Sequence, residues 1–83
     1  MYQVIVEKSV IKQLQKISKP DYTKIKTALV SLATNPGPHG YLKLKGRDAY
    51  RIRVGDYRII YEIRDKELVV LVITIAHRKD VYE

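Results

Sequence analysis

Apolar and polar residues alternate over residues 50–63, on both sides of a Gly55-Asp56 dipeptide. Such alternation, interrupted by a glycine-containing dipeptide, predicts two antiparallel strands joined by a tight turn. Because side chains in a strand alternate between faces, the arginines of this segment are expected on one face of the hairpin. A two-residue turn pairs the strands as follows: Val54 with Tyr57, Arg53 with Arg58, and Arg51 with Ile60.

The first half of the chain predicts one strand and two helices. Residues 2–7 alternate as a strand does, and apolar residues then recur at helical spacing over residues 10–17 and 22–33. We expect Ser9 to cap the first helix. Pro20 is expected to end it, because the residue before a proline is pushed out of the helical region. The buried stripe predicted for the second helix consists of Tyr22, Ile25, Ala28, Leu29, Leu32 and Ala33.

The second half predicts an antiparallel sheet. Turn residues over 35–40 stop the second helix, and residues 41–48, which alternate leucine with lysine, predict a short edge strand or an extended loop. Asp65-Lys66 predicts another tight turn before the β-branched run 68–76, which is typical of a central strand. Residues 1–83 are therefore expected to form one domain. It is an α+β fold of order β-α-α-β-β-β, with a two-helix hairpin packed on a mostly antiparallel, twisted sheet.

The turn at Asp65-Lys66 also predicts how the last strand divides between two faces. A turn of two or four residues pairs Ile63 with Leu68, Tyr61 with Val70, and Ile59 with Val72, and these residues would join the core. A three-residue turn would exchange the two faces of the last strand. With the first register, the face that carries the arginines also carries Val69, Leu71, Ile73, Ile75 and His77.

The charge balance points to a polyanionic partner. The chain has 16 lysines and arginines against 9 acidic residues, a formal charge of +7. Such an excess favours nucleic acid first and an acidic protein second. The absence of cysteine excludes disulfides and thiolate metal sites, and it fits a cytosolic setting. No segment has the pattern of a signal peptide or the length of a membrane span.

Arginines of the central hairpin are the first candidates for chemistry. Like charges placed opposite each other destabilise a hairpin, whereas guanidinium groups suit phosphate and remain charged at any working pH. The alternative is that they are solvated strand positions, paired with Glu62, Asp56 or an acidic partner. Arg78 adds a fourth guanidinium just after the last strand. The hairpin members of the set are Arg51, Arg53 and Arg58.

Further candidates lie in the tail and in the leucine–lysine segment. Tyr82 could stack on a base or assist proton transfer, and His77 could act as acid or base. His39, within the proline-glycine loop, is expected to be a surface residue. Period-two spacing would let a basic set follow a phosphate backbone: Lys43, Lys45 and Arg47.

The motifs of nucleotide loops, metal clusters and nucleophile elbows are absent, and acidic residues are few and scattered. A site without metal or cofactor, built from guanidiniums, a tyrosine and a histidine, therefore remains. Such a site suits RNA cleavage by the neighbouring 2′-hydroxyl, which needs alignment of the reacting oxygens and stabilisation of a crowded phosphate.

Three segments together resemble the RelE/ParE toxin superfamily, and its RelE branch most closely. The segments are Leu44-Lys-Gly46, the block Tyr50 to Ile63, and the run Val72 to Tyr82, which ends in His-Arg-Lys-Asp-Val-Tyr. The resemblance extends over nearly the whole chain. It implies a toxin of a type II toxin–antitoxin system, located in a prokaryotic cytoplasm. The implied activity is that of an mRNA endoribonuclease that acts in the ribosomal A site and needs no metal.

The resemblance also implies roles for particular residues. The family's cleavage site corresponds here to Arg51, Arg53, Arg58, Arg78 and Tyr82. The family prototype has lysines at the positions of the first two, and arginine cannot give up its proton as a lysine can. His77 is then expected to be the substitute general base, since histidines occupy the neighbouring site in related toxins.

The resemblance further implies a RelB-like antitoxin that covers the basic, partly apolar face, while the complex binds promoter DNA through the antitoxin. No membrane partner is expected. Two alternatives share the scaffold. One is a ParE-like inhibitor of gyrase without nuclease activity, and the other is an inactive relative that serves only as the antitoxin's partner in DNA binding.

Overall fold

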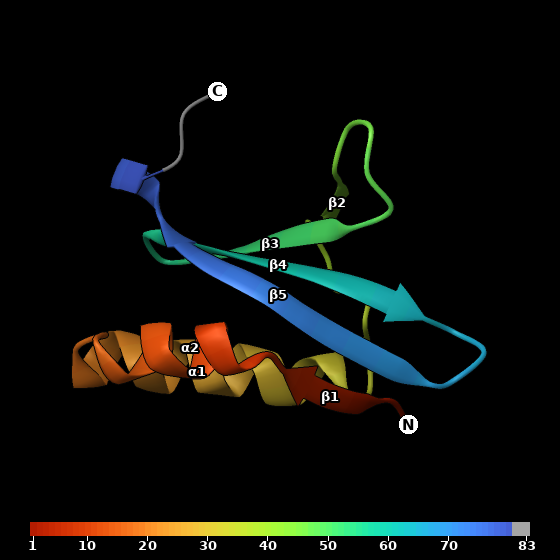
Figure 1. The fold of residues 1–83 in the computed structure, drawn as a ribbon, viewed down its shortest axis with the longest axis horizontal. Helices are drawn as coiled ribbons and strands as arrows, with labels where there is room; N and C mark the ends of the chain where they lie inside the picture. Colours follow the sequence, from red (N-terminus) through yellow and green to blue (C-terminus); the bar gives the residue numbers. More distant parts are fainter. Residues whose placement is uncertain (81–83) are drawn as a thin grey trace.

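The computed structural model describes residues 1–80, which form a five-stranded sheet with two helices on one face (Figure 1). The strands lie in the order β1-β5-β4-β3-β2; β1 pairs with β5 in parallel, and the other neighbours are antiparallel. The predicted α+β fold and order of elements are confirmed. The elements are β1 (Gln3–Val6), α1 (Lys8–Gln15), α2 (Lys19–Leu32), β2 (Leu42–Lys43), β3 (Tyr50–Val54), β4 (Tyr57–Arg64), β5 (Val69–His77) and the 3-10 helix η1 (Arg78–Asp80).

The hairpin of β3 and β4 has the predicted register. Gly55 has a φ of 59° and Asp56 does not share this left-handed conformation, which is the pattern of a two-residue turn with glycine at its first central position. All three predicted cross-strand pairs are present: Val54–Tyr57, Arg53–Arg58 and Arg51–Ile60.

The predicted register of β5 is wrong, for two local reasons. The turn before β5 comprises residues 65–68, with Leu68 at a φ of 53°, so that Ile63 pairs with Val70 and Tyr61 with Val72. A register shift between Ile60 and Tyr61 then leaves Ile73 without a partner on β4. Because one extra residue inverts the alternation of a strand, Ile75 lies in the core and not on the arginine-bearing face.

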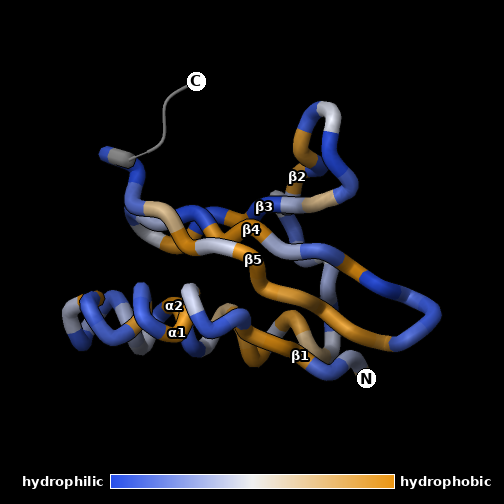
Figure 2. Tube along the Cα trace, viewed as in Figure 1, coloured by the Kyte–Doolittle hydropathy of each residue, from blue (hydrophilic) through white to orange (hydrophobic). Residues whose placement is uncertain are grey.

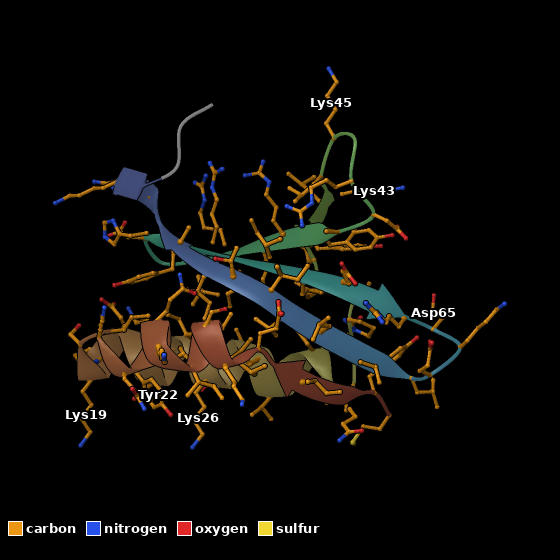
Figure 3. The ribbon with its side chains drawn as sticks, in the orientation of Figure 1. Lys19, Tyr22, Lys26, Lys43, Lys45 and Asp65 are labelled. Atoms are coloured by element: carbon orange, nitrogen blue, oxygen red, sulfur yellow. The ribbon has the colours of Figure 1, made fainter. Side chains whose placement is uncertain are left out.

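The core lies between the helices and one face of the sheet. Ile25, Leu29 and Leu32 of α2 are buried against the sheet, and Figure 2 shows hydrophobic residues concentrated along β1, β5 and the facing parts of the helices. Tyr22 was expected in this stripe, but its side chain is 38% exposed. It points away from the sheet, as Lys19 and Lys26 do (Figure 3). The strands contribute Ile52, Ile59, Tyr61, Val70, Val72 and Ile75.

The helix ends differ from the prediction by a few residues. Glu7, and not Ser9, is the residue that precedes the first turn of α1, and Pro20 lies inside the first turn of α2 instead of ending α1. A proline is tolerated there because the first N–H groups of a helix have no partner within the helix. No helix within residues 1–80 is long and apolar enough to cross a membrane.

α1 is tied to β5 by one side-chain hydrogen bond. β1 pairs with β5 only as far as Val72, so the backbone of β5 beyond that point needs other partners. Gln13 meets this need, because its Oε1 accepts a hydrogen bond of 3.2 Å from the N–H of Ile75. This contact fixes α1 over the irregular part of β5.

Replacing Gln13 by alanine should lower the free energy of unfolding by about 1–3 kcal/mol, because a partly buried N–H loses its acceptor. Chemical denaturation measures the change. Gln15→Ala is the matched control, since Gln15 is exposed on the same helix and its side chain makes no hydrogen bond in the described part of the chain. Equal stabilities of the two variants would contradict the assigned role of Gln13.

Candidate functional site

The sheet face opposite the helices carries the arginines of the central hairpin, and we call it the arginine face. Arg53 and Arg58 are directly opposite each other, and Arg51 lies two residues from Arg53 on the same side of β3. Figure 3 shows nitrogen-tipped side chains projecting from this face, away from the helices. All three arginines line one cavity of about 190 Å³, the Arg51 cavity, together with Gly40 and Leu42.

A second cavity adjoins the first at the β3–β4 turn. This Arg78 cavity, of about 260 Å³, is lined by Arg53, Arg58 and Arg78 together with Gly55, Asp56 and Tyr57. Arg53 and Arg58 border both cavities. The structure thus brings the four predicted arginines to one continuous site, although Arg78 lies 20 residues beyond Arg58 in the sequence.

The start of η1 is held to the β3–β4 turn through Asp56. The backbone N–H of Arg78 donates a hydrogen bond of 2.7 Å to the carbonyl of Asp56, and Arg78 Nε lies 3.8 Å from Asp56 Oδ1. Both side chains are mostly exposed, so the ion pair itself is weak. The backbone bond is what keeps Arg78 beside the other arginines.

The two carboxylates considered as partners of the hairpin arginines pair with other arginines. Glu62 forms an ion pair of 2.9 Å with Arg64, and Asp56 pairs with Arg78. Within residues 1–80, neither Arg51 nor Arg53 forms an ion pair with a carboxylate. Uncompensated guanidiniums at a concave surface attract anions.

His77 lies on the other side of the sheet. The bulge in β5 turns its side chain toward the helices, where its ring packs edge-to-face on Tyr57 at 5.0 Å. It lines a cavity with Gln13 of α1 and Lys16, the residue after that helix, and its Nδ1 accepts a hydrogen bond from the N–H of Lys79. The prediction that His77 shares the arginine face is therefore wrong.

The remaining predicted residues are not brought to the arginine cavities. Lys43 ends β2, and Lys45 projects from the following loop in a different direction (Figure 3). These lysines and Arg47 are exposed, and none of the three lines either arginine cavity. Tyr82 lies outside the described residues. Within residues 1–80, no cluster of three His, Asp or Glu side chains could hold a metal ion.

A further cavity, beside the Arg51 cavity, is lined by His39, whose predicted exposure at the surface is confirmed. The His39 cavity, of about 350 Å³, is bordered by α2, the loop 38–40 and β3, and it shares Gly40, Ile52 and Arg53 with the Arg51 cavity. The signal in the sequence was the Pro38-His39-Gly40 turn. It precedes β2, and the pairing of β2 with β3 brings the turn close to the arginines.

Aromatic residues, of which Tyr61 is fully buried, hold this loop against the sheet. The hydroxyl of Tyr61, on β4, donates a hydrogen bond of 2.7 Å to the carbonyl of Pro36. The rings of Tyr41, Tyr50 and Tyr61 form a series, with centroids 5.4 Å and 6.2 Å apart. Burial, more than the neighbouring phenols, raises the pKa of Tyr61 to about 12. The hydroxyl therefore keeps its proton and remains a donor to the loop.

Comparison with known families identifies the class of this chain, a toxin of a type II toxin–antitoxin system. A family described as "ParE toxin of type II toxin-antitoxin system, parDE" matches residues 4–82. The chain belongs to this family, within the RelE/ParE superfamily.

Relatives named RelE align with nearly all of this chain. The RelE of an archaeal RelE–RelB complex from Pyrococcus horikoshii is 32% identical, with a TM-score of 0.86 and coverage of 96% of this chain and 98% of that one. The isolated RelE toxin of Escherichia coli is 26% identical, with a TM-score of 0.80 and coverage of 93% and 84%. A Methanocaldococcus jannaschii protein named as toxin RelE1 is 29% identical, with coverage of 99% and 96%.

Tyr61→Phe should lower stability at neutral pH by about 1 kcal/mol, because the carbonyl of Pro36 loses its donor. The folded-state pKa of Tyr61 lies above the ordinary value of 10, so its contribution is fully present below pH 10 and is lost as the pH rises toward 12. The stability difference between wild type and Tyr61→Phe should therefore shrink over that range.

Denaturant unfolding at several pH values measures this difference. Tyr50→Phe is the control, because the Tyr50 hydroxyl makes no hydrogen bond in the described residues. A difference for Tyr61→Phe that stays constant from pH 8 to 12 would show that the Tyr61 proton does not matter.

Proposed function

We propose that this toxin is a ribosome-dependent mRNA endoribonuclease whose arginine face binds the scissile phosphate. The observation that carries the proposal is the gathering of Arg51, Arg53, Arg58 and Arg78 around two adjoining cavities. A cross-strand pair of like charges costs roughly 0.2–1 kcal/mol of stability. An anionic substrate gives that arrangement a use.

The arginines supply charge stabilisation and alignment. Cleavage by the neighbouring 2′-hydroxyl forms a crowded phosphorane in which negative charge accumulates on the non-bridging oxygens. Guanidinium donors fixed around that position stabilise the transition state more than the ground state. Adjoining cavities bordered by the same two arginines also suit consecutive phosphates of one strand. Tyr82 is proposed to stack on a base next to the cleaved bond.

The proposed partner is a RelB-like antitoxin of acidic, amphipathic character. The Pyrococcus horikoshii relative was solved as a RelE–RelB complex, and this chain carries a charge of +7. An open groove of about 630 Å³ beside α1 and α2 is lined by Val6, Ile11, Leu14, Ile17 and Tyr22. Apolar side chains of an antitoxin would be buried there, with its acidic residues near the lysines of the helices.

A gyrase inhibitor is the second candidate, because the matching family is described as parDE. Such an activity needs a protein-binding surface and no phosphate site. Expression of the chain without an antitoxin, described next, separates the two candidates.

Expression of the chain without an antitoxin should arrest translation and produce transcripts cut within coding regions, with a 2′,3′-cyclic phosphate or a 3′-phosphate at the new ends. Mapping of transcript ends after induction measures this. Arrested DNA replication with intact transcripts would support the gyrase inhibitor instead. Absence of any growth arrest would support the third alternative, an inactive relative that serves only as the antitoxin's partner in DNA binding.

Arg53→Thr should make the protein more stable and less active. Removing the like-charge pair raises the melting temperature by about 1–5 °C, while the loss of one phosphate donor lowers the cleavage rate by about 10- to 10³-fold. Thermal unfolding and ribosome-bound mRNA cleavage measure the two effects. Arg64→Thr, at an exposed arginine outside both cavities, should leave cleavage unchanged. If the Arg53→Thr variant cleaves mRNA at the wild-type rate, Arg53 does not belong to the cleavage site.

A further inference from the structure

Within residues 1–80, the arginine face offers no obvious group to accept the proton of the 2′-hydroxyl. Arginine stays protonated at any working pH. Of the other ionisable side chains that line the Arg51 and Arg78 cavities, Asp56 is paired with Arg78 and Tyr57 packs on His77 toward the helices. His77, the general base expected from the sequence, lies on that same helix side.

The geometry points to His39 as the general base of the proposed cleavage reaction. Its cavity shares Gly40, Ile52 and Arg53 with the Arg51 cavity. β2 pairs only with Tyr50 and Arg51 of β3, so the edge of β3 from residue 52 onward faces the loop that carries His39. The cavity that His39 lines therefore adjoins the cavity in which Arg51 and Arg53 would hold a phosphate. This inference rests on the proposed function.

The loop places His39 without help from the substrate. Tyr41 donates its N–H to the carbonyl of Pro38 at 3.0 Å, and Gly40 has a φ of 88°. This is the pattern of a type II turn with His39 at its first central position. The Tyr61 hydroxyl fixes the same loop through Pro36. A group held in place before binding reacts without a further loss of entropy.

The surroundings of His39 allow its imidazole to exchange protons with solvent and substrate. The side chain is exposed, and the charged group in its cavity is the guanidinium of Arg53 on β3. α2 contributes the uncharged Ala28 and Ser31 to the same cavity, and the loop contributes Pro38. Histidine is the residue type whose charge ordinarily changes between about pH 5 and 8.

The reaction balances with one histidine. The neutral imidazole takes the proton of the 2′-hydroxyl while the O2′–P bond forms. The P–O5′ bond then breaks, and the leaving 5′-oxygen takes a proton from water. The products are a 2′,3′-cyclic phosphate and a 5′-hydroxyl, and the imidazolium returns its proton to solvent.

His39→Gln should reduce single-turnover cleavage of mRNA on programmed ribosomes by about 10²- to 10⁴-fold, with affinity for the programmed ribosome within threefold of wild type. The acidic limb of the wild-type pH–rate profile should disappear. Added imidazole should restore part of the activity of His39→Ala, which a purely structural role would not permit. His77→Gln is the matched control, and it should cleave within threefold of wild type.

Several outcomes would overturn the inference. A His39→Gln variant that cleaves at the wild-type rate, or that keeps the wild-type pH profile, excludes His39 as the base. If His39→Gln unfolds, His39→Ala is tested in its place. A folded His39→Ala variant that added imidazole does not reactivate also excludes His39 as the base. Wild-type protein that leaves mRNA intact would refute the proposed function, whereas cleavage by wild type and His39→Gln alike would refute only the role of His39.

Discussion

The two-residue turn at Gly55-Asp56 is the constraint on which the other features depend. With glycine in a left-handed conformation, the turn fixes the register of β3 and β4, and this register decides which face each side chain occupies. Ile52, Ile59 and Tyr61 are thereby directed into the core, while Arg53 and Arg58 are brought together on the opposite face. A slip of one residue would bury guanidiniums and expose the core at the same time.

The same turn links the sheet to the end of the chain. Its Asp56 carbonyl binds the N–H of Arg78, so the fourth arginine is positioned by the turn that positions the first three. On the other side of β3, the loop before β2 is held by Tyr61, a residue of the core. Each side of the arginine face is therefore attached to a rigid element, which is what a site for an extended polyanion requires.

The sequence was sufficient to predict the β3–β4 hairpin and the common face of its three arginines, because a glycine-containing turn between alternating strands leaves one register. It was insufficient for β5, where the extra residue at Ile73 depends on how β4 and β5 fit over the core. No pattern in a run of β-branched residues marks such a bulge, so His77 was assigned to the wrong face. The position of His39 next to the arginine cavities could not be predicted for a related reason: its neighbours come from β3, which is distant in the sequence but adjacent in the sheet.

β5 lies between β1 and β4 and supplies Val70, Val72 and Ile75 to the core, yet it follows the other four strands of the sheet in the sequence. Until it emerges, β1 has no strand to pair with, and β4 has an open edge. A nascent or truncated chain that lacks β5 therefore cannot close the sheet or bring Arg78 to the other arginines. The complete site can therefore form only after β5 has joined the sheet, so the strand that completes the core also brings the fourth arginine into place.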